Sequence, residues 1–195
     1  MINLNLFDFQ QETVDRLLAY TEDITSKQTI TVKSPTGSGK TIILIDYIDE
    51  YLEVSPETAF VWLCPGKGAL EEQSRQKMIK YAPGRTAQTL DDALTSGFTA
   101  KSTTFINWEK DNNAIKDSEK QNLFDQIKRA KRDGLQFIII IDEEHSNKTA
   151  KAQEIIDAFD ARHIIRVSAT TKETDRSEFI EINENDVIAS GLITR

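Results

Sequence analysis

The segment that most constrains the fold of this chain is a loop at residues 34–41, which reads Ser-Pro-Thr-Gly-Ser-Gly-Lys-Thr. A short run rich in β-branched residues, 29–33, precedes it, and an apolar-rich segment, 41–52, follows. This order predicts a strand, a tight loop and a helix. Glycine allows the loop to turn its backbone N–H groups inward, beside the positive end of the helix dipole. The loop is therefore predicted to bind phosphate.

Each residue type in the loop has a predicted role toward a nucleoside triphosphate. The Lys40 ammonium reaches the β- and γ-phosphates, and the Thr41 hydroxyl binds Mg²⁺. Ser34 stands where the consensus pattern has glycine, and the alternative is a Gly/Ser-rich turn before an ordinary helix. The pattern predicts ATP and Mg²⁺ as cofactors, with further contacts from Pro35, Thr36, Gly37, Ser38 and Gly39.

Composition limits the class of protein. The chain has 195 residues and a net charge of −8, from 24 Lys and Arg against 32 Asp and Glu. The length suits one domain, and the acidity argues against a protein that coats nucleic acid by bulk charge, although a local basic groove is compatible with it. The sequence has no apolar run long enough to span a membrane, and its N-terminus does not have the pattern of a signal peptide. Cys64 is the lone cysteine, so the chain forms no internal disulfide. We therefore expect a cytoplasmic protein without membrane contact.

Predicted strands and helices alternate along the chain. This alternation predicts an α/β fold with a mainly parallel central sheet and helices on both faces. Ligands of such sheets bind beyond the carboxyl ends of the strands, where the phosphate loop lies. Strands are expected at 29–33, 59–64, 102–107, 136–141, 163–167 and 179–182, and helices at 9–20, 41–52, 69–81, 90–94, 123–130, 148–159 and 187–192.

Acidic side chains follow the most apolar predicted strand, 136–141. Asp142 is placed to hold Mg²⁺, and Glu143 to orient or deprotonate an attacking water. The alternative is that these carboxylates only cap the next helix. His145 either hydrogen-bonds to the segment 168–170 (Ser-Ala-Thr) or is a surface histidine.

In order and spacing, these segments resemble the motifs of superfamily 2 helicases and translocases. Residues 34–41 resemble motif I, residues 142–145 (Asp-Glu-Glu-His) motif II, and residues 168–170 motif III. The resemblance implies a RecA-like P-loop NTPase domain over residues 1–195. It also implies that Gln10 reads the adenine edge, and that Ser168, Ala169 and Thr170 couple the nucleotide state to domain movement. The implied catalytic residues are Lys40, Asp142, Glu143 and His145.

Two further segments resemble the nucleic-acid contacts of this family. Residues 64–67 are similar to motif Ia, and residues 103–108 to a later motif that contacts the strand. Trp108 either stacks on a base or packs in the core, and Lys67 either binds a phosphate or is a solvated turn residue. The resemblance implies contacts with single- or double-stranded DNA through Pro65, Gly66, Lys67, Thr103, Thr104, Asn107 and Trp108.

Within the superfamily, residues 105–108, 147–153 and 186–193 are similar to the restriction (Res) subunit of type III restriction–modification enzymes. This resemblance implies an ATP-dependent DNA translocase or helicase. Its second RecA-like domain, with an arginine finger, is expected outside this chain, and a nuclease domain and a modification methyltransferase are expected partners. Two alternatives stay open: a nucleotide-gated DNA-binding module that does not translocate, and another DNA-repair-type helicase. The motif II and motif III pair argues against a small-molecule kinase.

Overall fold

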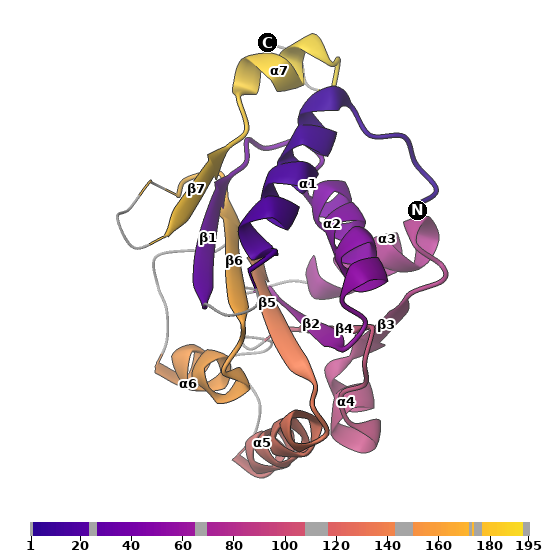
Figure 1. The fold of residues 1–195 in the computed structure, drawn as a ribbon, viewed down its shortest axis with the longest axis vertical. Helices are drawn as coiled ribbons and strands as arrows, with labels where there is room; N and C mark the ends of the chain where they lie inside the picture. Colours follow the sequence, from indigo (N-terminus) through magenta and orange to yellow (C-terminus); the bar gives the residue numbers. More distant parts are fainter. Residues whose placement is uncertain are drawn as a thin grey trace.

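The computed structural model describes residues 2–23, 27–64, 70–107, 117–142, 150–171, 173 and 177–192. Strands and helices alternate through these residues (Figure 1). The strands are β1 (Gln28–Lys33), β2 (Thr58–Leu63), β3 (Thr86–Thr89), β4 (Ser102–Ile106), β5 (Gln136–Asp142), β6 (His163–Ser168) and β7 (Glu178–Glu181). The helices are α1 (Asp8–Thr21), α2 (Lys40–Val54), α3 (Leu70–Tyr81), α4 (Leu90–Ser96), α5 (Asp117–Arg132), α6 (Ala150–Phe159) and α7 (Glu184–Ala189).

The strands form one sheet in the order β3-β4-β2-β5-β6-β1-β7, and each neighbouring pair is parallel. The two most apolar strands, β2 and β5, pair at its centre and are buried along almost their whole length. A continuous apolar run suits a parallel strand that is covered on both faces. The predicted parallel sheet is therefore confirmed. In this order only β6 lies between β1 and β5, so the carboxyl ends of these two strands are close together.

Helices cover both faces of the sheet, as predicted. Side chains alternate along β2, so that Phe60 and Trp62 pack in one core cluster and Val61 and Leu63 in the other. The first cluster includes residues of α1, α2 and α3, and the second includes residues of α4, α5 and α6. Figure 1 shows α1 and α2 on one side of the sheet and α5 and α6 on the other.

One strand and several helix starts differ from the sequence prediction. β3 is an edge strand of sequence Thr-Ala-Gln-Thr, in which Gln88 is the buried residue, so it lacks the apolar alternation that predicts a strand. α5 begins at Asp117 and α7 at Glu184, several residues earlier than predicted. The start of α7 is explained by Asn183, whose side chain accepts a 2.8 Å hydrogen bond from the Asn185 N–H.

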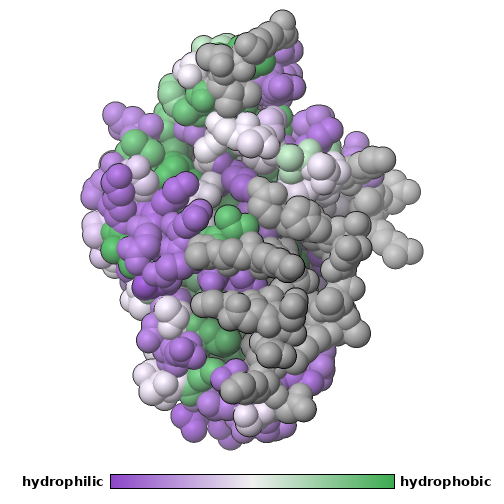
Figure 2. Space-filling view, turned by 180° about the vertical axis from the view of Figure 1, so that it is seen from behind, coloured by the Kyte–Doolittle hydropathy of each residue, from purple (hydrophilic) through white to green (hydrophobic). Residues whose placement is uncertain are grey.

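The face of the molecule behind that of Figure 1 is mostly polar where its residues are described. Figure 2 shows the face opposite to that of Figure 1, where hydrophilic residues predominate and hydrophobic ones lie in small groups. None of the described helices is long and apolar enough to cross a membrane.

Asp46 on α2 is a buried carboxyl group, and burial, together with Glu50 and Asp49, raises its pKa to about 7. We expect Asp46→Asn to increase the free energy of unfolding by about 1–2 kcal/mol near pH 8 and to change it little near pH 4. The folded protein favours the protonated form of Asp46, so the wild type loses stability as the pH rises from the unfolded pKa, 3.8, through 7. Asparagine carries no charge at either pH and therefore avoids this loss. Urea unfolding at both pH values measures the difference, with Asp15→Asn on the exposed face of α1 as the control. A difference that is the same at both pH values would contradict the prediction.

Candidate nucleotide-binding site

The loop between β1 and α2 has the backbone geometry that its sequence predicts. Gly37 and Gly39 adopt left-handed conformations with φ of 84° and 75°, which favour glycine. The Ser38 N–H donates to the Pro35 carbonyl at 3.2 Å, and the Ile43 N–H donates to the Gly39 carbonyl at 3.0 Å. The loop therefore turns tightly and ends at the N-terminus of a helix of 15 residues, a favourable place for an anion.

Lys40 and Asp142 meet at the carboxyl edge of the sheet. The Lys40 ammonium lies 3.1 Å from Oδ1 of Asp142, and their side chains are 20% and 7% exposed. The indole N–H of Trp62 on β2 donates to Oδ2 of the same carboxylate at 3.3 Å. The structure thus brings together two predicted site residues that are far apart in the sequence, and it adds Trp62, which the sequence prediction placed only in a strand.

Ser34, which replaces the consensus glycine, is accommodated by a second serine. Its hydroxyl lies 2.5 Å from the hydroxyl of Ser38, and both residues are at least 98% buried. The Ser34 N–H also donates to the Ser168 carbonyl at 3.0 Å. The start of the loop is therefore bonded both to its own far end and to the end of β6. The spacing of four between Ser34 and Ser38 is compatible with this contact, which the sequence prediction did not include.

Gln10 packs directly against the loop. Its side-chain amide donates to the Ser38 carbonyl at 3.1 Å and accepts from the Phe7 N–H at 2.9 Å. A Cβ atom added at Gly39 would lie 2.5 Å from the Gln10 amide nitrogen. The first helix and the loop thus fit together only because residue 39 has no side chain.

The remaining predicted residues of this site are placed as follows. Ser168 is buried at the end of β6, Ala169 is half-buried and Thr170 is exposed. Pro35 and Thr41 are half-buried, and Thr36 and Gly37 are exposed on the loop. Glu143 and His145 lie outside the described residues.

Cys64 follows β2 and is a structural thiol, as its apolar context predicts. The residue is 1% exposed, and its N–H donates to the Ile106 carbonyl at 2.9 Å. Burial, followed by the negative charge of Asp142, raises the pKa of the thiol. The thiol is therefore neutral and unreactive at ordinary pH.

Most of the sequence matches a family model. The model of the type III restriction enzyme, res subunit, matches residues 3–173. The chain belongs to this family. The resemblance inferred from the sequence motifs is thereby confirmed, while none of the curated proteins matches the sequence.

One solved structure with a TM-score above 0.5 shares the fold of this chain. The SWI2/SNF2 ATPase core of Sulfolobus solfataricus in complex with dsDNA is 15% identical with a TM-score of 0.61, over 87% of this chain and 33% of that chain. At this identity the likeness shows the fold alone, and it confirms the predicted RecA-like α/β fold. This chain spans about a third of the length of that ATPase core.

Two further solved structures have lower TM-scores. Pif1 helicase from Candida albicans is 12% identical with a TM-score of 0.41, over 93% of this chain and 40% of that chain. The genome packaging NTPase B204 from Sulfolobus turreted icosahedral virus 2, in complex with AMP, is 13% identical with a TM-score of 0.39, over 80% of this chain and 65% of that chain.

The structure corrects two of the predicted nucleic-acid contacts. Thr103 and Thr104 lie inside β4 and are fully buried. The hydroxyl of Thr104 accepts a 2.7 Å hydrogen bond from the Gln88 side chain on the neighbouring strand β3. Because both faces of β4 are covered, neither hydroxyl is available to a DNA phosphate. Pro65, Gly66, Lys67 and Trp108 lie outside the described residues.

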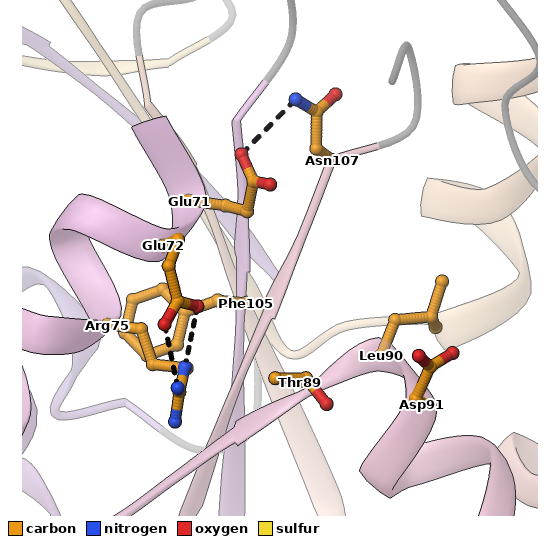
Figure 3. A pocket seen from close by; sticks show the side chains of 8 residues that line it. All are labelled: Glu71, Glu72, Arg75, Thr89, Leu90, Asp91, Phe105 and Asn107. Atoms are coloured by element: carbon orange, nitrogen blue, oxygen red, sulfur yellow. Dashed lines mark hydrogen bonds and ion pairs between the residues drawn. The ribbon is translucent and has the colours of Figure 1, made fainter. Parts of the chain in front are cut away.

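Asn107, another predicted contact, lines a pocket of about 450 Å³ beside the ends of β3 and β4 (Figure 3). Its amide donates to Glu71 at 3.2 Å, and Arg75 forms hydrogen bonds of 2.7 and 2.8 Å with Glu72. Asp91 adds a further carboxylate across the pocket. The described lining thus carries more negative than positive charge, which disfavours a phosphate backbone at this place.

Proposed function

We propose that this chain is the first motor domain of an ATP-dependent DNA translocase or helicase. The observation that carries the proposal is the contact between Lys40 of the phosphate loop and the Asp142 carboxylate, 3.1 Å apart at the carboxyl edge of a parallel sheet. In P-loop NTPases a lysine and a carboxylate in these positions hold the phosphates and Mg²⁺ of the nucleotide. Family membership and the RecA-like fold support the same interpretation.

The described residues fit a nucleotide with Mg²⁺. The left-handed glycines let the loop turn tightly at the N-terminus of α2, where an anion is favoured. The buried Asp142 supplies the oxygen ligand that Mg²⁺ prefers. In the proposed complex, the loop N–H groups and Lys40 bind phosphate, while Thr41 and Asp142 hold the metal. Bound Mg²⁺ would neutralise charge that develops on the phosphates.

Other residues complete the proposed site. Glu143 orients or deprotonates the attacking water, with His145 beside it, and Gln10 reads the adenine. Residues 168–170 couple the nucleotide state to a second RecA-like domain, which would supply an arginine finger. Without that arginine, turnover is expected to be ~10³–10⁵-fold slower. The bond between the Ser34 N–H and the Ser168 carbonyl supports this coupling, because it joins the loop to the coupling segment.

DNA is the proposed nucleic acid, in single- or double-stranded form. The family match to a restriction subunit supports this choice, and the structural relative named above was solved with dsDNA. The proposed contacts are Pro65, Gly66, Lys67 and Trp108, whereas Asn107 is left out because acidic side chains line its pocket. A nuclease domain in the same polypeptide and a modification methyltransferase subunit complete the type III restriction assembly that we propose.

DNA-stimulated ATP hydrolysis by the polypeptide that carries both motor domains tests the proposal. We expect DNA to increase turnover in the wild type, and Glu143→Gln to abolish hydrolysis while nucleotide binding remains. A wild-type protein whose turnover does not respond to DNA would contradict the translocase function.

A nucleotide-gated DNA-binding module is the second candidate, because the same phosphate loop and Lys40–Asp142 pair would serve a protein that binds DNA without translocation. Displacement of a triplex-forming strand separates the two candidates. A translocase displaces that strand during ATP hydrolysis, whereas a gated module binds DNA without displacing it.

A further inference from the structure

Trp62 contacts the Asp142 carboxylate from the neighbouring strand. Trp62 pairs in register with Ile140, so Asp142 lies two residues further along β5, on the same face of the sheet. This diagonal distance is within reach of a large aromatic side chain. The indole nitrogen lies 3.3 Å from Oδ2, and the two residues are 0% and 5% exposed. The contact is therefore buried and independent of the phosphate loop.

The two oxygens of Asp142 have different partners. Oδ1 faces the Lys40 ammonium and Oδ2 accepts from the indole N–H, which is a donor only. Together these contacts fix the plane of the carboxylate. A hydrogen bond to a charged group in a buried setting is stronger than one between neutral groups. Trp62 thus holds one oxygen and leaves the other directed at the phosphate loop.

The indole ring is itself held in place. Trp62 packs against Phe105 of β4 in a tilted arrangement, with ring centroids 5.2 Å apart and planes at 31°. The ring is fully enclosed in the core cluster that also includes Phe60 and Ile140. It cannot turn its N–H away from Asp142 without disturbing this packing.

We infer that Trp62 is a positioning residue, which orients Asp142 for Mg²⁺ and keeps it oriented when Lys40 exchanges the carboxylate for phosphate. This inference rests on the proposed nucleotide function. A tryptophan that only fills the core would contribute stability but would not affect the metal. The two roles are separable because the N–H and the ring of Trp62 contact different neighbours.

Trp62→Phe keeps an aromatic ring and removes the N–H. We expect it to bind a fluorescent ATP analogue in EDTA within about twofold of the wild-type affinity, since no metal is involved. Mg²⁺ is expected to increase the affinity for the analogue, and the Mg²⁺ midpoint is the concentration that gives half of this increase. We expect Trp62→Phe to raise this midpoint about tenfold, because the loss of one hydrogen bond to a charged group weakens binding by about that factor. Phe60→Leu is the matched control, because it removes an aromatic ring from the same strand and core cluster while the Trp62–Phe105 pair and the indole N–H stay in place. It should lower stability and leave the Mg²⁺ midpoint unchanged.

A second measurement does not depend on the folding of Trp62→Phe. Trp62 is the remaining tryptophan in a Trp108→Phe background, because the chain has two tryptophans. Its emission is expected to shift on saturation with Mg·ATP, since the charges around its hydrogen-bond partner change. Unchanged emission, with binding verified by the labelled analogue, would overturn the inference, as would an unchanged Mg²⁺ midpoint in Trp62→Phe. A wild-type protein without Mg²⁺-dependent nucleotide binding would instead overturn the proposed function.

Discussion

Lys40→Ala is expected to reduce ATP turnover by ~10²–10³-fold, the loss typical when one preorganised donor to developing charge is removed. The ammonium lies at the end of the phosphate loop, on the first residue of α2. Alanine cannot supply the positive charge that the ammonium is proposed to place beside the phosphates. Steady-state hydrolysis by the polypeptide with both motor domains measures the loss. Lys33→Ala is the matched control, because Lys33 is another lysine next to the loop that pairs with an exposed carboxylate, Glu181, at 3.7 Å.

The same substitution also removes the cation beside a buried carboxylate. Asp142 is 5% exposed, so we expect Lys40→Ala to lower the free energy of unfolding by about 1–3 kcal/mol. The double variant Lys40→Ala/Asp142→Asn removes that charge, and it should regain stability without regaining turnover. Recovery of turnover in the double variant would contradict the proposed role of both residues, and wild-type turnover in Lys40→Ala would contradict the proposed site.

The parts of the fold that could be predicted are those in which local sequence decides structure. The continuous apolar runs of β2 and β5, rich in β-branched and aromatic residues, favour buried strands, and the glycines before Lys40 permit the tight loop. By contrast, β3 has no apolar pattern and forms because β4 offers it a free edge. The strand β3 depends on tertiary contacts, so its local sequence does not predict it.

The site shows the same division. The roles of Lys40 and Asp142 follow from motif and position, but the contacts around them depend on how strands and helices are placed side by side. Trp62 reaches Asp142 only because β2 pairs with β5 in this register, and Gln10 reaches the loop only because α1 packs there. Burial of Thr103 and Thr104 likewise comes from covering both faces of β4. The motif resemblance places Gln10 at the nucleotide site, but the local sequence predicts neither the Trp62–Asp142 contact nor the burial of the two threonines.

Gly39→Ala is expected to weaken nucleotide binding about 10²-fold. An alanine at φ of 75° is strained by about 1–2 kcal/mol, and its Cβ would lie 2.5 Å from the Gln10 amide nitrogen. To relieve this clash, Gln10 must give up its hydrogen bond to the Ser38 carbonyl, which shifts the loop whose N–H groups are proposed to bind phosphate. Titration with a fluorescent ATP analogue measures the affinity, and urea unfolding measures the stability.

Two other glycines separate the causes of this loss. Gly134 has a φ of 89° with open space around its Cβ position, so Gly134→Ala carries the backbone strain without a clash and should lower stability but not nucleotide affinity. Gly84, with neither feature, should tolerate alanine. Adding Gln10→Ala to Gly39→Ala removes the clash and should restore part of the stability, while the strain remains. Equal losses of affinity in Gly134→Ala and Gly39→Ala would show that backbone strain anywhere in the chain impairs binding, and the close fit of Gln10 against Gly39 would then have no special role.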